Sequence, residues 1–162
     1  MRKLNIFLGI FLALAISRLI PHPPNFTSLI ALSFYVPALL GIVYMPIVVL
    51  SLAITDIFLG IHNTMFFTWS SVIIISFMAK YFSSSILKRF SGALLSAVIF
   101  YFVTNFGVWA TGLYDNSING LVTSYILALP FFGYTIISTF VFAAIIEASY
   151  KLFETLKSRT KV

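Results

Sequence analysis

Long apolar stretches, separated by short polar segments, run through the whole of this chain. A helix needs roughly 20 apolar residues to cross the hydrocarbon core of a bilayer, and somewhat fewer where it is short. Six stretches approach or exceed that length. The expected helices are 4–20, 26–41, 43–60, 65–82, 91–111 and 121–150. The pattern therefore predicts an all-α protein of about six transmembrane helices, with a single helical domain over 1–150.

Prolines break this pattern at two places. The stretch "SRLIPHPPNF", residues 17–26, follows the first apolar run and contains three prolines that cannot continue a helix. We call this proline segment the strap, and expect it to hold Arg18 and His22 on stiff, non-helical backbone. Pro130 lies inside the last stretch, which is too long for one straight span, so we expect it to divide a short segment from a final helix.

Composition narrows the class of protein. Hydrophobic residues make up 60% of the chain and charged residues only 9%, whereas soluble domains carry roughly a quarter charged residues. This composition predicts an integral membrane protein. The absence of cysteine excludes disulfides, thiolate metal sites and cysteine nucleophiles. The net charge of +6 is concentrated in short segments, which favours an orientation signal over a nucleic-acid surface.

Lysine and arginine predict the orientation, because cytoplasmic loops are enriched in both. Six crossings place the basic clusters on one side of the membrane, whereas five crossings do not. Both termini are then cytoplasmic, residues 151–162 form a basic cytoplasmic tail, and the strap lies on the outer side. The clusters are Arg2 and Lys3, then Lys80, Lys88 and Arg89, and finally Lys151, Lys157, Arg159 and Lys161.

The first stretch has a competing interpretation. "MRKLNIFLGIFLALAIS" has a basic start, an apolar core and small residues at its end, as a signal peptide does. We expect it to be retained as a helix, because the five remaining spans would need its packing surface.

Polar residues of unusual type converge at the outer level of this topology. Groups of this kind are costly within a membrane and usually face a partner or a cavity, so we take them as candidate substrate-binding residues. The candidates are Arg18, His22, Asn25, Asp56, His62, Asn105, Trp109 and Tyr114.

Two of these groups admit more than one interpretation. Arg18 and Asp56 both end spans on the outer side, and their pairing fits either a structural ion pair or part of a ligand site. Tyr101, Asn105 and Trp109 recur every four residues, so they share a helix face that could form a pocket wall. The alternative is an interfacial tryptophan and an interhelical asparagine hydrogen bond.

The sequence contains no motif that predicts catalysis. It lacks a glycine-rich phosphate loop, a GxSxG motif and an HExxH motif, and its acidic residues do not match a paired-carboxylate protease. His22 and His62 have no metal-binding spacing, and solvated or hydrogen-bonded imidazoles are expected. We therefore expect no enzyme activity, no cofactor and no metal.

The cytoplasmic half carries weaker signals. Gly9 and Ala13 form a small-xxx-small pair that would let a partner helix approach closely. Residues 147–162 are expected to be helical and to extend the last span, because Glu147 and Lys151 are spaced i,i+4 and Glu154 and Lys157 are spaced i,i+3.

The motifs "RLIPHPPNFT", "TDIFLGIH" and "TNFGVW" resemble those of a family of small bacterial membrane proteins whose function is not established. The resemblance runs from Arg18 to Thr139. More distantly, the layout is similar to that of the substrate-binding S components of energy-coupling factor (ECF) vitamin transporters. That similarity implies a multi-pass protein of the bacterial inner membrane with a pocket on its outer face. It also implies docking through Gly9 and Ala13, where glycine replaces the usual first alanine, on a transmembrane coupling subunit driven by ATPases.

Three functions are consistent with these features. The leading hypothesis is a subunit that captures a small, vitamin-like nutrient from the outer side and is energised by partner subunits. The second is an envelope scaffold similar in size and span count to the cell-shape protein MreD, with its outer polar groups satisfied internally. The third is a small ion-coupled carrier that uses Asp56 as its proton site.

Overall fold

The computed structural model describes residues 2–159, and the side chains from residue 4 onward, as helices joined by short connections. The expected basic side chains of Arg2, Lys3 and Lys161 lie outside this description. The elements are α1 (Arg2–Leu19), α2 (Leu29–Leu40), the 3₁₀ turn η1 (Ile42–Tyr44), α3 (Met45–Leu59), α4 (Met65–Met78), the 3₁₀ turn η2 (Ala79–Phe82), α5 (Ile86–Ala110) and α6 (Ile118–Arg159). The expected all-α class is confirmed.

Within residues 2–159, four helical segments are long and apolar enough to cross a membrane. They are Ile42–Leu59, Met65–Phe82, Ile86–Ala110 and Ile118–Arg159. The segments Leu4–Leu19 and Leu29–Leu40 are apolar but shorter.

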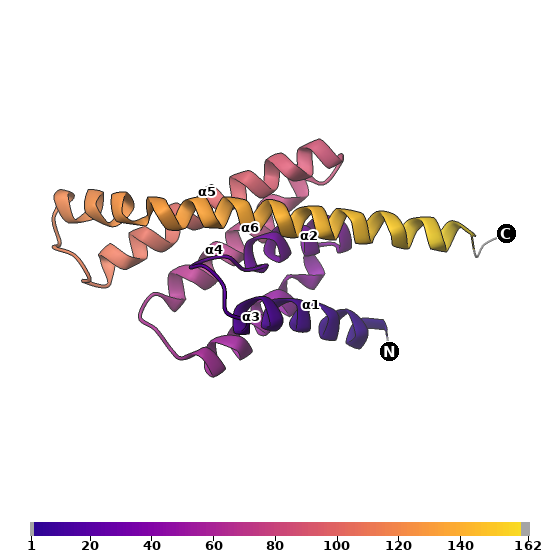
Figure 1. The fold of residues 1–162 in the computed structure, drawn as a ribbon, viewed down its shortest axis with the longest axis horizontal. Helices are drawn as coiled ribbons and strands as arrows, with labels where there is room; N and C mark the ends of the chain where they lie inside the picture. Colours follow the sequence, from indigo (N-terminus) through magenta and orange to yellow (C-terminus); the bar gives the residue numbers. More distant parts are fainter. Residues whose placement is uncertain (1, 160–162) are drawn as a thin grey trace.

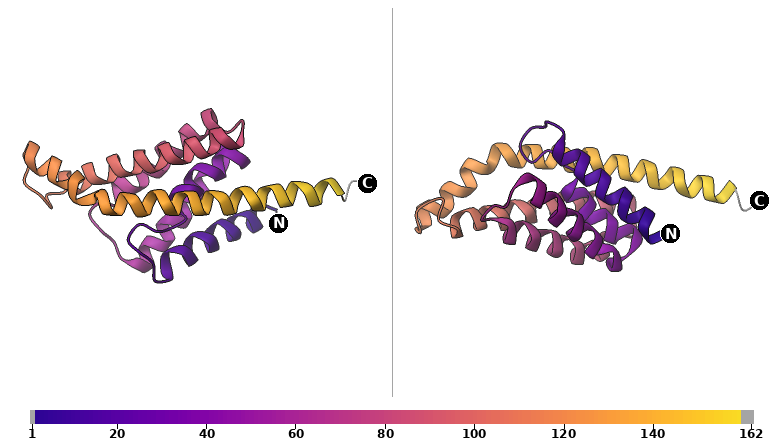
Figure 2. Two further views of the ribbon diagram at one scale, coloured as in Figure 1. Left: turned by 45° about the horizontal axis from the view of Figure 1, so that its top comes forward. Right: turned by 90° about the horizontal axis from the view of Figure 1, so that it is seen from below.

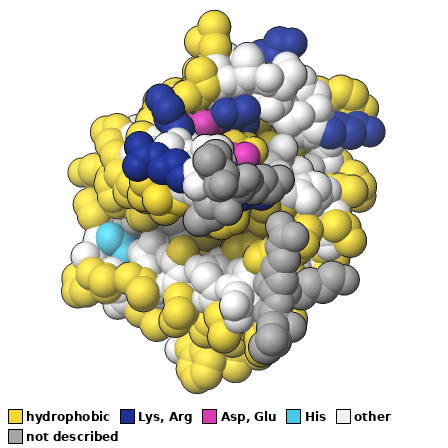
Figure 3. Space-filling view, turned by 90° about the vertical axis from the view of Figure 1, so that its right-hand side faces the viewer, with side chains coloured by type: hydrophobic (Ala, Val, Ile, Leu, Met, Phe, Trp, Pro, Cys, Tyr) yellow, Lys and Arg dark blue, Asp and Glu magenta, His cyan; other side chains and the backbone are white. Residues whose placement is uncertain are grey.

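The helices alternate in direction, so that α1 begins and α6 ends on the same side of the molecule (Figure 1). The turn between η2 and α5 also lies toward that side, which we call the basic end. The strap and the connection at 60–64 lie away from it, at what we call the strap end. The hairpin of α5 and α6 projects beyond the strap (Figure 2). Viewed from the basic end, Lys and Arg side chains gather over one part of the face, with acidic side chains beside them (Figure 3).

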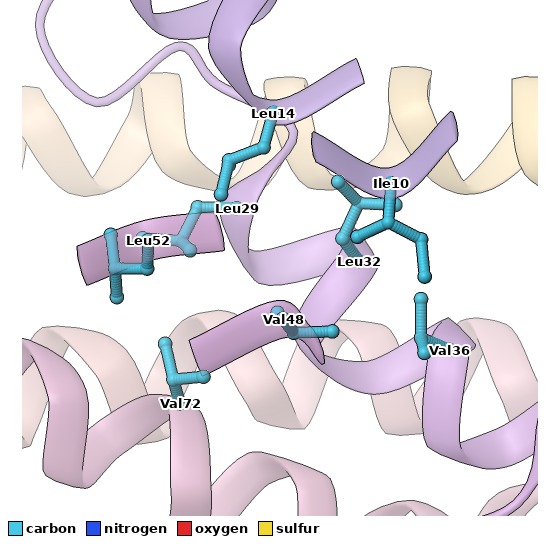
Figure 4. Packing of buried hydrophobic residues seen from close by; sticks show 8 residues of the cluster. All are labelled: Ile10, Leu14, Leu29, Leu32, Val36, Val48, Leu52 and Val72. Carbon is cyan, nitrogen blue, oxygen red and sulfur yellow. The ribbon is translucent and has the colours of Figure 1, made fainter. Parts of the chain in front are cut away.

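Helix α2 is the centre of the bundle. Every residue from Leu29 to Pro37 is buried, and the helix packs on α4, α5 and α6. One apolar cluster joins Leu29, Leu32 and Val36 of α2 to side chains of α1, α3 and α4 (Figure 4). A second joins it to α4, α5 and α6 through residues such as Phe34 and Ala143.

Helix α2 is also shorter than expected, because the non-helical strap spans residues 20–28 in the structure. Arg18, expected on the strap, lies instead in the last turn of α1. The Ser28 amide donates to Ser17 Oγ at 3.1 Å, and the Ser28 hydroxyl donates to the Ala13 carbonyl at 3.2 Å. These bonds tie the start of α2 to α1. The helix therefore begins at Leu29 instead of residue 26.

The expected break at Pro130 is wrong. Helix α6 is continuous over 42 residues, about 63 Å at 1.5 Å per residue, and bends in its N-terminal part. A proline removes one backbone hydrogen bond and its ring displaces the preceding turn. A helix that continues through a proline is therefore kinked at that point. Contacts with α5 lie on both sides of Pro130. The Tyr101 hydroxyl donates to the Tyr125 carbonyl before it, and the rings of Phe90 and Phe140 stack after it.

An ion pair joins α5 to α6 at the basic end. Arg89 donates to both oxygens of Glu147, at 2.5 and 2.8 Å, and to the Ser83 carbonyl at 3.0 Å. The expected helical extension is confirmed as far as Arg159, but Glu147 pairs with Arg89 of α5 and not with Lys151, its i,i+4 neighbour. Glu147 is buried toward α5, where the planar guanidinium matches its carboxylate in a two-bond geometry that an ammonium group cannot make.

Candidate functional site

The strap is fixed to helix α6. Asn25 adopts a left-handed conformation (φ 62°), which turns the chain toward α2. Ser138 on α6 donates to the Asn25 carbonyl at 3.3 Å, and the rings of Phe26 and Phe142 lie 6.4 Å apart. With proline limiting φ at three positions, few backbone conformations remain open to this segment.

A buried cluster of polar groups lies directly beneath the strap. Arg18 Nη2 donates to Asp56 Oδ1 at 2.6 Å, and Trp69 Nε1 donates to Asp56 Oδ2 at 2.7 Å. Arg18 Nη1 also bonds Thr55 Oγ1 and lies 3.5 Å from the Leu52 carbonyl. The Asp56 side chain is only 1% exposed. Each oxygen of this buried carboxylate accepts a hydrogen bond, one from a donor on α1 and one from a donor on α4.

A cavity of about 430 Å³ opens beside this cluster at the strap end. The strap and the 60–64 connection bound it on one side, and the projecting hairpin of α5 and α6 bounds it on the other. Its volume falls within the roughly 300–1,000 Å³ range of small-molecule sites. The polar lining residues are Arg18, His22, Asn25, Thr27, His62, Thr64, Thr68, Tyr101, Thr104, Asn105 and Thr135.

Several of these polar groups retain unused hydrogen-bonding capacity. Asn105 donates one amide hydrogen to the Tyr101 carbonyl at 2.7 Å, which leaves its oxygen and second hydrogen free within the described chain. The Asn25 side chain has no partner among the described residues. The Thr104 and Thr135 hydroxyls donate to carbonyls of their own helices, so they offer lone pairs as acceptors.

An aromatic wall faces these amides. Phe100 and Tyr101 come from α5, and Phe131 and Phe132 come from α6. The rings of Tyr101 and Phe132 lie 4.5 Å apart at 36°, and the Tyr101 hydroxyl is engaged by the Tyr125 carbonyl at 2.6 Å. Tyr101 therefore presents its ring, and not its hydroxyl, as a contact surface.

The structure brings together five of the eight candidate residues named from the sequence. Arg18, His22, Asn25, His62 and Asn105 line the cavity, drawn from α1, the strap, the 60–64 connection and α5. Asp56 lies behind Arg18 and is absent from the lining.

Trp109 and Tyr114 lie elsewhere. The Trp109 indole donates to the carbonyls of Asp115 and Ser117, at 3.0 and 3.2 Å, and so fastens the connection between α5 and α6. Tyr114 lines a separate polar hollow at the tip of that hairpin. The spacing of four residues does place Tyr101 and Asn105 on one face, but Trp109 lies one residue before the helix ends, where loop carbonyls are within reach.

Two features of the site were missed from the sequence. Trp69 completes the Asp56 cluster by donating to its carboxylate. The sequence did offer an indication of this, because an indole N–H inside an apolar span needs a hydrogen-bond acceptor. The aromatic wall on α6 was also missed, because Phe131 and Phe132 sit in a run that reads as generic apolar sequence. Their role becomes visible only when α5 lies beside them.

The two histidines are held in different ways. The ring nitrogens of His22 lie 2.7 and 3.3 Å from the carbonyls of Pro23 and Arg18. His62 Nδ1 lies 2.9 Å from Thr64 Oγ1. Within the described residues, no group of three His, Cys, Asp or Glu side chains is arranged to hold a metal ion.

Gly9 and Ala13 lie on the outer surface of α1. A side chain added at Gly9 would meet nothing within 4 Å. Ala13 borders an apolar groove between α1 and α6, together with residues such as Ile145 and Ile146.

Comparison with known proteins identifies one family. The model of a family of unknown function (DUF6580) matches residues 1–161. No curated protein and no solved structure matches the chain.

Proposed function

We propose that this chain, which belongs to the family of unknown function (DUF6580), is a membrane-embedded protein that captures a small organic nutrient from the outer side. The observation that carries this proposal is the cavity of about 430 Å³, lined by amides, one guanidinium and an aromatic wall. Pockets that combine apolar walls with a few convergent polar groups are the usual sites for small ligands.

The proposed topology has six crossings of a bacterial inner membrane, with both termini in the cytoplasm. Four segments have the length and apolar character to cross, and the alternating direction of all six helices supports counting α1 and α2 as crossings too. The basic end corresponds to the cytoplasmic side under the positive-inside rule. The cavity then opens to the outer side.

Binding without catalysis is proposed for the site, with Arg18, Asn25 and Asn105 as the principal polar contacts. The stiff strap supports this assignment, because a wall that is already ordered costs little conformational entropy when a ligand binds. The two histidines border the same cavity, and the rings on α5 and α6 supply stacking surfaces.

We further propose that uptake needs a partner. The exposed positions Gly9 and Ala13, beside an apolar groove, suit a transmembrane helix of a coupling subunit that is itself driven by ATPases. In its specific form, the proposal is that the nutrient is vitamin-like and that the coupling subunit is of the ECF type.

A thermal-stability screen tests the binding function. The purified chain in lipid nanodiscs is heated with a panel of water-soluble vitamins and their precursors. Each compound is present at a concentration far above a micromolar Kd. A ligand at 100 times its Kd stabilises the folded state by about 2.7 kcal/mol, which corresponds to a rise in Tm of several degrees. We expect at least one compound to produce that rise.

Asn105→Ala and Tyr114→Phe provide the matched comparison. Asn105 lines the cavity, whereas Tyr114 lies outside it, and each substitution removes one polar group. A stabilising compound should lose its effect in the first variant and keep it in the second. A panel without any hit, or a hit that is equally strong in both variants, would favour the envelope-scaffold function.

A further inference from the structure

Among Lys, Arg, Asp and Glu, the charges at the cavity are already balanced, and His22 and His62 are the other lining residues that can carry a positive charge. Arg18 is the one Lys, Arg, Asp or Glu residue among the lining residues, and its guanidinium is paired with Asp56 at 2.6 Å. Asp56 sits behind it at 1% exposure, and Trp69 occupies the second carboxylate oxygen. The one guanidinium in the cavity lining is therefore neutralised by a carboxylate that lies behind it.

Because the guanidinium is already neutralised, we expect the affinity of a ligand for this cavity to depend on its charge. An anion would bring an uncompensated negative charge close to a buried carboxylate, and a cation would meet the guanidinium face. A charge that leaves water without a counter-charge is costly, whereas a neutral polar group needs only hydrogen bonds.

The lining can still supply those hydrogen bonds. A guanidinium has five N–H donors, and the contacts of Arg18 with Asp56, Thr55 and Leu52 use three, which leaves two. Asn105 contributes a free hydrogen and a free oxygen, and threonine lone pairs add acceptors. This mixture matches a group that both accepts and donates, as a carboxamide does.

From this geometry we propose that the ligand is a net-neutral molecule with a planar ring and an uncharged carbonyl or amide group. This proposal rests on the proposed capture function and adds the chemical class of its ligand. The ring lies against the wall that includes Tyr101 and Phe132, and the carbonyl accepts from Arg18. Asn105 completes the recognition of the amide edge.

The test uses three probes of nearly equal shape: benzamide (neutral), benzoate (anionic) and benzamidine (cationic). Their affinities for the full chain in nanodiscs are measured by ligand-observed NMR titration at pH 7. We expect benzamide to bind about tenfold more tightly than either charged probe, a difference equivalent to about 1.4 kcal/mol. Cyclohexanecarboxamide, which keeps the amide but lacks the planar ring, should bind more weakly than benzamide.

Removing the charge of Asp56 should change the preference. In Asp56→Asn the guanidinium is no longer neutralised, so benzoate should become the tightest of the three probes. The matched control is Asp115→Asn, which removes the same charge from an exposed position on the hairpin tip and should retain the preference for benzamide.

A second variant covers the possibility that Asp56→Asn fails to fold. The new amide nitrogen would face the Trp69 N–H donor, so Asp56→Asn is combined with Trp69→Phe to remove that conflict. The proposal is overturned if a charged probe matches benzamide in the unmodified chain, if none of the probes binds, or if the Asp56 and Asp115 variants behave alike. A charged vitamin that stabilises the chain in the thermal screen would overturn this inference and leave the capture function standing.

Discussion

At the scale of single residues, the Asp56 carboxylate connects three helices. It accepts from Arg18 at the end of α1 and from Trp69 on α4, while itself belonging to α3. Both of its oxygens are filled by protein donors, and the group does not line the cavity. This arrangement makes Asp56 a positioning residue for Arg18, and it offers no free carboxylate for the proton site of an ion-coupled carrier.

Asp56→Ala should therefore destabilise the protein strongly. Removing one partner of a buried pair leaves the other charge uncompensated, and the expected loss is about 3–5 kcal/mol. Trp69→Phe, which removes a single hydrogen bond, should cost only about 1–2 kcal/mol. Thermal unfolding in nanodiscs checks both values, with Asp115→Ala as the exposed control. Equal stability of the Asp56 and Asp115 variants would contradict this assignment.

The pairing of Arg18 with Asp56 could be predicted from the sequence, because both end spans on the same side and a lone charge in a membrane needs a partner. The third member, Trp69, could not, since tryptophan near a span end reads equally well as an interfacial anchor. The same ambiguity led to Trp109 being grouped with the cavity residues. Its indole instead bonds loop carbonyls whose position depends on how the hairpin closes.

At the scale of elements, two glycines set how closely helices approach α5. A Cβ at Gly107 would overlap the Phe67 ring on α4, and one at Gly92 would overlap the Phe34 ring on α2. The absence of a Cβ at these two positions lets α4 and α2 pack closely against α5.

Gly107→Ala should therefore weaken the packing of α4 on α5. The added methyl group must displace the Phe67 ring, which typically costs about 1–3 kcal/mol in a packed interior. Gly133→Ala is the matched control on α6, because a Cβ there meets nothing within 4 Å and alanine favours the helix by about 1 kcal/mol. Chemical or thermal unfolding separates the two, and a Gly107 variant as stable as the Gly133 variant would show that the contact is not tight.

Hydropathy located every helix, but it did not determine how the helices are used. The hydropathy pattern predicts an ordinary transmembrane span at α2. In the structure, α2 is a 12-residue helix in the core of the bundle and is buried along most of its length. The continuity of α6 through Pro130 depends on its packing against α5, a long-range contact that local sequence does not encode. The ion pair of Arg89 and Glu147 arises in the same way, from residues 58 positions apart.

At the scale of the whole molecule, the fold separates a basic end from a strap end with a cavity. The natural absence of cysteine makes this arrangement directly testable by single-cysteine labelling. In spheroplasts, His62→Cys and Asn116→Cys should react with a membrane-impermeant maleimide. Lys88→Cys should react only after permeabilisation, because it lies at the basic end. Reaction of Lys88→Cys in intact spheroplasts would reverse the proposed orientation.

The central claim, that the cavity at the strap end holds a small molecule, is tested most directly by native mass spectrometry of protein released gently from nanodiscs. We expect a stoichiometric small-molecule adduct on the unmodified chain and on Tyr114→Phe, and its loss in Asn105→Ala. A bare protein mass for the unmodified chain, or an adduct that persists equally in Asn105→Ala, would contradict the claim.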